Sequence, residues 1–113
     1  MNRRDMQILQ KVIQEIDVAE ELIKGKSLED FIDSELLKRA ICMTVINIGE
    51  LIKNVTSETR QKNKHVPWKA AAGFRDITAH KYQTLKMEDV YQTVIYDFPE
   101  LRKLLVDVLS ETE

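Results

Sequence analysis

The chain has 113 residues, of which 43% are hydrophobic and 32% charged, with a formal net charge of −2. We expect residues 1–113 to form one domain, because two independent cores would be unusual at this length. The share of apolar residues excludes a disordered tail, and three Gly and two Pro are too few for the turns of an all-β sandwich or barrel. Long helices with few connections fit this composition better.

A single cysteine, Cys42, limits the covalent and metal chemistry open to the chain. One cysteine makes no intramolecular disulfide and no Cys-based zinc site, so a reducing cytoplasm is the default setting. The longest apolar runs, such as residues 40–45, are far shorter than the roughly 18–20 residues of a membrane span. The N-terminus has an amphipathic pattern in place of the solid apolar stretch of a signal peptide. We therefore expect a cytoplasmic protein that does not enter a membrane.

The N-terminal part predicts a long amphipathic helix from Arg4 to about Lys24. Apolar residues recur there at spacings of three and four, between charged ones: Met6, Leu9, Val12, Ile13, Ile16, Ala19, Leu22 and Ile23. Gly25 follows at the position where a glycine commonly ends a helix. Residues 27–30 then resemble the capped start of a short helical turn.

A second long helix is expected from about Asp33 to Val55. Its apolar residues occupy most of the helical circumference: Leu36, Leu37, Ala40, Ile41, Met43, Val45, Ile46, Ile48, Leu51, Ile52 and Val55. In one interpretation part of this surface contacts another subunit, since a core this small seldom covers a helix on all sides. In the other, this is a central helix wrapped by the remaining three. The pattern does not separate the two.

The C-terminal half predicts two more helices. Residues 56–66 are polar and basic with no period, which indicates a connection. Pro67 suits the first turn of a third helix, from Trp68 to about Lys81. A fourth helix begins near Lys86, and Pro99 should kink it or split it just before that point. The predicted architecture is all-α, an up-and-down bundle of four or five helices.

Charge is distributed unevenly along the chain. Between Lys53 and Lys81 there are seven cations and two anions, a local net charge of +5, whereas the rest carries ten cations and 17 anions, a net charge of −7. A basic segment on an acidic scaffold attracts phosphate locally and keeps non-specific binding low. A solvated loop with chance clustering has the same composition, so charge alone does not decide.

Residues 74–82 hold side chains with catalytic chemistry inside this basic segment. On an α-helical projection, Arg75, Asp76 and His80 lie on the face opposite to the apolar residues of this stretch. A lone His is usually structural, but His80 is placed on a polar face, and Asp76 is four residues away, close enough to orient the imidazole or raise its pKa. Arg75 and His80 are not on one line, so they converge only if the helix ends near Ala79 or if a second subunit contributes.

An arginine together with a histidine suggests RNA cleavage without a metal. The guanidinium is a forked donor for phosphate oxygens, and an imidazole exchanges protons near neutral pH. The His would activate the 2′-hydroxyl or protonate the 5′-leaving oxygen, and the Arg would stabilise charge on the phosphorane. Metal-dependent hydrolysis is a poor competitor because His65 and His80 do not have a metal-ligand spacing, and no G-x-S-x-G elbow supports a serine nucleophile. We expect neither a metal nor a cofactor.

The stretch Arg75-x4-His80-x-Tyr82 resembles the signature of HepT-type proteins in the HEPN superfamily (higher eukaryote and prokaryote nucleotide-binding). The similarity covers nearly the whole chain. It includes Arg3-Arg4-Asp5, residues 25–31, Asn47-Ile48-Gly49-Glu50, Val66-Pro67-Trp68 and residues 97–101. Asp76 stands where the family often has Asn, and Leu51 stands where it has Ala.

The resemblance implies a HEPN-type bundle that works as a homodimer, with the two motifs facing one shared cleft. It also implies the toxin of a prokaryotic type VII toxin–antitoxin pair, acting as a metal-independent endoribonuclease on RNA. By match, Arg75 and His80 would be catalytic, with Asp76 in support. The usual partner is a minimal nucleotidyltransferase (MNT) antitoxin, which transfers AMP to the motif tyrosine, here Tyr82.

Other interpretations stay open at this point. Many family members are known only as dimeric partners of nucleotidyltransferases, which would make the chain a binding subunit with little nuclease activity of its own. A purely structural helical dimer does not explain four chemically active side chains on one exposed segment. Tyr82 is either a core residue or a modification site, and its projection near the line of Arg75, away from the apolar face, favours modification.

Overall fold

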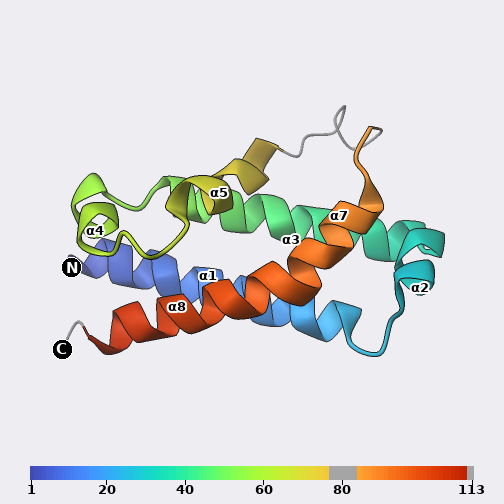
Figure 1. The fold of residues 1–113 in the computed structure, drawn as a ribbon, viewed down its shortest axis with the longest axis horizontal. Coiled ribbons are helices and arrows are strands. Elements are labelled where there is room, and N and C mark those ends of the chain that lie inside the picture. Colours follow the sequence, from blue (N-terminus) through green and yellow to red (C-terminus); the bar gives the residue numbers. More distant parts are fainter. Residues whose placement is uncertain (77–83, 112–113) are drawn as a thin grey trace.

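The computed structural model describes residues 1–76 and 84–111, with the side chains of all of these except Arg75 and Asp76. Every regular element in the described residues is a helix. Four units alternate in direction along the molecule: α1 (Arg3–Ile23), α3 (Glu35–Lys53), the short pair of α5 (Trp68–Ala72) and η1 (Gly73–Asp76), and the run of α7 (Met87–Gln92), η2 (Thr93–Asp97) and α8 (Phe98–Ser110) (Figure 1). This arrangement confirms the predicted all-α up-and-down bundle.

The first two helices begin and end close to the predicted positions. Asn2 caps α1 by accepting a hydrogen bond from the Asp5 backbone N–H at 2.7 Å. After α1, Gly25 takes a φ of 74°, a left-handed conformation that glycine adopts without a steric cost. Ser27 and Asp30 form the capping box of α2 (Leu28–Asp33), each side chain accepting from the backbone N–H of the other.

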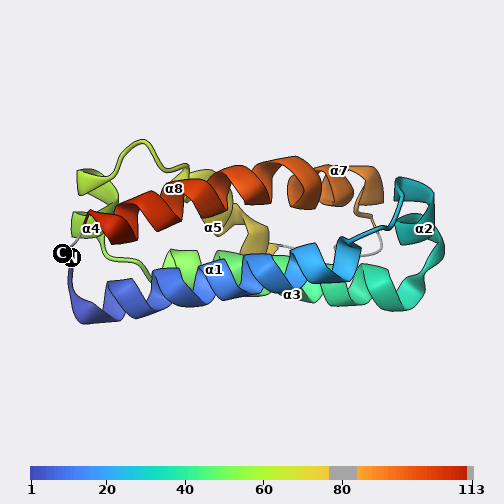
Figure 2. The same cartoon turned by 90° about the horizontal axis from the view of Figure 1, so that it is seen from below.

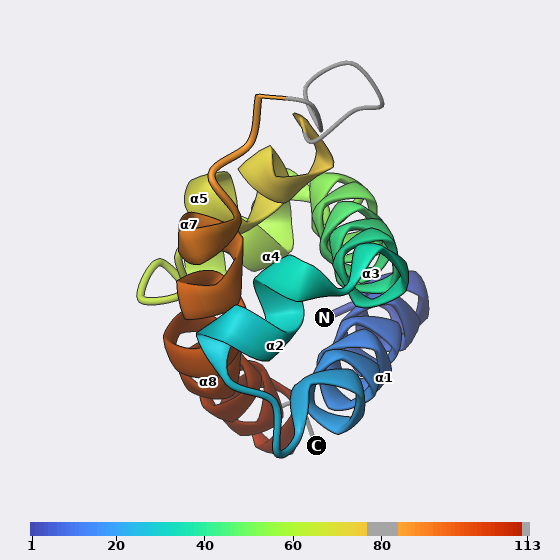
Figure 3. The ribbon, with the colours of Figure 1, turned by 90° about the vertical axis from the view of Figure 1, so that its right-hand side faces the viewer.

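α3 contacts α1, α2, α5 and η1. It packs along α1 on one side and against α5 and η1 on another, and α2 crosses one end of the bundle (Figure 3). Ile41, Val45, Ile48 and Ile52 are buried in the core. Packing within the chain therefore explains most of the apolar circumference that the sequence shows.

The core is one apolar cluster enclosed by α1, α3 and the α7–α8 run, with Phe31 and Phe98 among its largest fully buried side chains. The Phe31 ring lies 5.7 Å from the Tyr91 ring, and the Tyr91 hydroxyl donates to the Lys26 carbonyl at 2.7 Å. These contacts hold α2 and the α1–α2 turn against α7. Within residues 1–76 and 84–111, no helix combines the length and the hydropathy needed to cross a bilayer.

A helix occupies the region where the sequence indicated only a connection. α4 (Ser57–Lys62) lies within residues 56–66, so that prediction was wrong. Thr56 caps α4, its side chain accepting from the Thr59 backbone N–H at 3.4 Å. Six residues are too few to display an apolar period, because an amphipathic pattern needs about three turns.

The predicted third helix is interrupted early. α5 ends after five residues, and the chain continues from Gly73 to Asp76 as the 3₁₀ helix η1, so the α-helix predicted from Trp68 to Lys81 was wrong over these residues. Gly73 explains the change, because glycine is a poor α-helix former and 3₁₀ turns are frequent at helix ends. Residues 77–81 lie outside the described part of the chain.

The kink or split predicted just before Pro99 takes the form of a wider turn, in a run that stays helical from Met87 to Ser110. Proline has no backbone N–H to donate within a helix, and the turn just before it widens into the π-helix η2, where the Phe98 N–H donates to the Thr93 carbonyl. α8 then runs alongside α1 (Figure 2), and Arg102 pairs with Asp17 across the two helices at 2.7 Å.

Candidate active site

The predicted catalytic segment begins in the 3₁₀ helix η1. The backbone of Arg75 and Asp76 lies there, whereas His80 and Tyr82 lie outside the described residues. An α-helical projection of these side chains requires one continuous α-helix. It does not hold over η1, because a 3₁₀ helix turns by about 120° per residue and an α-helix by about 100°. The mutual arrangement of Arg75, Asp76, His80 and Tyr82 therefore stays a prediction.

The backbone that carries Arg75 is anchored on the core. Trp68 at the start of α5 is 7% exposed, and its indole Nε1–H donates to the Asn63 carbonyl at 2.9 Å. Phe74, the residue before Arg75, packs edge-on against Phe98 with ring centroids 5.6 Å apart. α3 contacts both α5 and η1. These contacts fix the position of the backbone at the start of the predicted catalytic segment.

A buried carboxylate, Asp5, joins α1 to the start of α4. It is 0% exposed, and both the Thr56 and the Thr59 hydroxyls donate to its Oδ2 at 2.6 Å. Asn2 Nδ2 donates to the same oxygen at 3.4 Å, and the Thr56 backbone N–H donates to Oδ1 at 3.3 Å. Burial alone would raise the pKa of Asp5, but the hydrogen bonds from Thr56 and Thr59 and the charge of Arg4 outweigh it, so the pKa lies below its ordinary value of 3.8.

Sequence reasoning did not find this Asp5 cluster. Asp5 lies on the buried face of α1, where the spacing of three and four predicts an apolar residue. A charged residue at such a position is the available signal, because a buried charge needs partners. Its partners, Thr56 and Thr59, lie in a stretch whose sequence shows no apolar period.

The basic segment has two kinds of cation. The Arg60 guanidinium donates to the carbonyls of Ile52, Lys53 and Val55 at 2.8, 3.2 and 3.2 Å, which satisfies the C-terminal end of α3. This charge therefore serves the fold. The described lysines of the segment, Lys53, Lys62, Lys64 and Lys69, are exposed. Lys62 lies 3.7 Å from Glu58, so the other three are the better candidates for phosphate contacts.

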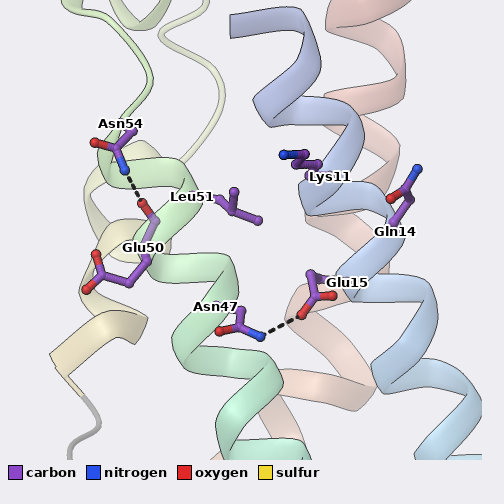
Figure 4. Close-up of a pocket in the computed structure, with 7 residues that line it drawn as sticks. All are labelled: Lys11, Gln14, Glu15, Asn47, Glu50, Leu51 and Asn54. Carbon is purple, nitrogen blue, oxygen red and sulfur yellow. Dashed lines mark hydrogen bonds between the residues drawn. The ribbon is translucent and has the colours of Figure 1, made fainter. Parts of the chain in front are cut away.

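A polar groove of about 450 Å³ lies between α1 and α3 (Figure 4). Asn47 donates to Glu15 across the groove at 3.1 Å, and Asn54 donates to the Glu50 carbonyl at 3.0 Å. Its charged side chains are one lysine, Lys11, and two glutamates, Glu15 and Glu50. The excess of carboxylates makes this groove a poor phosphate site, so the groove is not the place where RNA is expected to bind.

No group of three or more His, Cys, Asp or Glu side chains with a metal-binding arrangement is found in residues 1–76 and 84–111. His65, one of the two histidines, is exposed. Burial raises the pKa of the Cys42 thiol, which keeps it protonated and unreactive.

Comparison with known proteins gives a consistent result. A family model described as "Ribonuclease HepT-like" matches residues 12–108. The chain is 36% identical over 103 residues to "Putative RNase TTE0752" of Caldanaerobacter subterraneus subsp. tengcongensis, covering 91% of this chain and 92% of that protein. It is 26% identical over 102 residues to "Probable ribonuclease HepT" of Thermococcus cleftensis, covering 90% of this chain and 93% of that protein.

A third relative carries a second function in its name. The chain is 34% identical over 112 residues to "Gamma-glutamylcyclotransferase and putative RNase MJ0434" of Methanocaldococcus jannaschii. The match covers 98% of this chain but 50% of that protein, so the similarity concerns one half of the relative. No solved structure matches the chain.

Proposed function

The chain belongs to the HepT-like ribonuclease family, and we propose that it is the toxin of a prokaryotic HepT/MNT toxin–antitoxin pair, a metal-independent endoribonuclease. The observation that carries this proposal is the family match over residues 12–108, within which Arg75, His80 and Tyr82 occur in the order and spacing of the HepT signature. The relatives named as ribonucleases support RNA as the substrate.

The proposed reaction is transesterification within RNA. The 2′-oxygen attacks the adjacent phosphorus, the bond to the 5′-oxygen breaks, and the products are a 2′,3′-cyclic phosphate and a 5′-hydroxyl. His80 takes the proton of the 2′-hydroxyl or gives one to the leaving 5′-oxygen. Arg75 stabilises the negative charge that builds on the phosphoryl oxygens, and Asp76 supports this pair.

We propose that the active form is a homodimer. On α3, Leu36 is 83% and Met43 57% exposed. They are seven residues apart, so they lie on one face of the helix, with half-buried Ala40 between them. An exposed apolar face of this kind pairs with itself around a two-fold axis, as coiled-coil positions do. Because η1 packs on the same helix, the catalytic segments of such a dimer would both start from the paired α3 helices.

The dimer has a direct test. Light scattering at micromolar concentration should give about twice the chain mass for the wild type, and Met43→Glu should give a monomer, because a charge at the centre of an apolar interface is costly. Val106→Glu is the matched control, since Val106 is an exposed apolar residue on α8 and should leave the dimer intact. A monomeric wild type, or a Met43→Glu variant that stays dimeric, contradicts this interface.

We further propose that an MNT antitoxin neutralises the protein by modifying Tyr82. The phenol oxygen attacks the α-phosphorus of ATP, AMP is transferred, and pyrophosphate leaves with the phenol proton taken up by a base. The new phosphodiester carries a negative charge seven residues beyond Arg75. It would pair with the guanidinium and occupy the place of the RNA phosphate, so inhibition needs no change of fold.

Expression experiments test toxicity and neutralisation together. The chain alone should arrest growth of a bacterial host, and co-expression with its cognate MNT nucleotidyltransferase should restore growth and add one or more AMP masses at Tyr82. Tyr82→Phe should stay unmodified and escape neutralisation if active. Tyr96 is the control, because it is 69% exposed and available to an unselective enzyme; AMP on Tyr96 contradicts the proposal. Growth that is unaffected by the chain alone would instead favour a non-catalytic binding partner of the nucleotidyltransferase.

A further inference from the structure

A cavity of about 180 Å³ lies between α3, η1 and α7. Its floor is apolar: Val45 and Val90 are buried, and Phe74 contributes a half-buried aromatic ring. Its rim is polar: Lys86 and Asp89 are exposed, and Thr93 is half-buried. The cavity is thus an apolar slot whose polar lining residues are a lysine, an aspartate and a threonine.

The position of this cavity relates it to the proposed chemistry. Phe74 is the residue before Arg75, so their Cα atoms are about 3.8 Å apart. Lys86 follows the segment that contains His80 and Tyr82. The cavity therefore lies against both ends of the chain segment that carries the proposed catalytic residues.

We infer that this cavity holds one RNA base, preferably guanine, next to the phosphate that is cleaved. The inference rests on the proposed ribonuclease function and adds a specificity site to it. Drug-sized ligands occupy pockets of about 300–1,000 Å³, so a cavity smaller than these suits one nucleobase. Single-stranded RNA is recognised through bases that leave the stack, contact aromatic and apolar side chains, and bond through their edges.

The rim side chains favour guanine over the other bases. A carboxylate accepts hydrogen bonds only, and guanine presents two adjacent donors, N1–H and N2–H, that match the two oxygens of Asp89. Uracil offers one donor between two carbonyls, which would face the carboxylate charge. Lys86 at the same rim is placed to contact a neighbouring phosphate. Thr93 already donates its hydroxyl to the Asp89 carbonyl at 2.9 Å, which fixes the Thr93 side chain at the rim.

Two measurements test this site. The first is titration of the wild-type chain with GMP, AMP, CMP and UMP, followed by NMR, and the second is sequencing of the ends produced when the chain cleaves a random RNA. GMP should bind most tightly, and guanine should be enriched at one position beside the cleaved bond. Asp89→Asn should lower both preferences by about 5- to 150-fold, the range for one bidentate side-chain–base pair.

Glu88→Gln is the matched control, because Glu88 is exposed, precedes Asp89 on α7 and does not line the cavity. It should leave both preferences unchanged. Equal binding of the four nucleotides, or equal effects of Asp89→Asn and Glu88→Gln, overturns the site even if RNA is cleaved. Guanine-selective binding that depends on Asp89, without any RNA cleavage, would keep the site and refute the ribonuclease proposal.

Discussion

Replacing His80 with Ala is expected to lower the rate of RNA cleavage by about 10²–10⁴-fold, the usual contribution of a general acid or base. The wild-type rate should persist in EDTA, because the proposed reaction uses His80 and Arg75 in place of a metal. The assay is the cleavage of a labelled single-stranded RNA, with circular dichroism to show that each variant keeps its helical content. A His80→Ala variant within a few-fold of the wild type would remove His80 from the mechanism.

Variants at Arg75 and His65 distinguish a catalytic role from general attraction of RNA by positive charge. Arg75→Ala should also lose most activity, and Arg75→Lys should recover little of it, because an ammonium does not reproduce the forked contact of a guanidinium with phosphate. His65→Ala is the matched control for His80. His65 is exposed and lies in the same basic segment, so its loss should change the rate by no more than a few-fold. Equal losses from His65→Ala and His80→Ala would point to general RNA attraction by the segment.

The parts of the fold that the sequence predicts correctly are those with repeated or strong local signals. α1 and α3 each extend over five turns or more, so their apolar period is visible. Gly25 and Pro99 act through backbone geometry that few neighbours override. These signals define the bundle without knowledge of any tertiary contact.

The features that the sequence does not predict depend on contacts between distant residues. α4 is six residues long, and its stability comes from the Thr56 cap and the Asp5 cluster. In that cluster Asp5 bonds to Thr56 and Thr59, which follow it by 51 and 54 positions in the sequence. Arg60 looks like a phosphate-binding residue in a basic segment, yet it closes the end of α3. Charge counting does not distinguish these roles, because both use the same guanidinium.

Removal of the Asp5 carboxylate is expected to be the most destabilising single change outside the apolar core. Asp5→Ala leaves the Thr56 and Thr59 hydroxyls and the Thr56 N–H without their acceptor. Each buried donor left unsatisfied costs about 1–3 kcal/mol, which is about 3–9 kcal/mol for three. Thr56 is half-buried, so its two donors can bond to water in part. The free energy of unfolding should therefore fall by about 3–5 kcal/mol, a large part of the 5–15 kcal/mol typical of a domain. Urea unfolding followed by circular dichroism measures this loss.

Asp17→Ala is the matched control on the same helix. Asp17 pairs with Arg102 at 2.7 Å, but both side chains are substantially exposed, and such surface pairs contribute about 0–1 kcal/mol. The contrast between the two variants tests whether burial and hydrogen bonding, and not the negative charge of α1, make Asp5 important. Similar losses for Asp5→Ala and Asp17→Ala would contradict this account.

The pH dependence of stability gives an independent test of the same cluster. The pKa of Asp5 is lower in the folded chain than its ordinary value of 3.8, so the folded state binds this proton less readily than the unfolded state. The stabilisation by the Asp5 carboxylate is therefore complete at a pH above the pKa that Asp5 has in the unfolded chain. It is lost as the pH falls from there through the lower pKa that Asp5 has in the folded chain. Asp5→Asn keeps the shape but does not titrate, so its unfolding free energy should fall less steeply than that of the wild type below about pH 4–5. Parallel curves for the two proteins would show that the Asp5 carboxylate is not held in its charged form by Thr56 and Thr59.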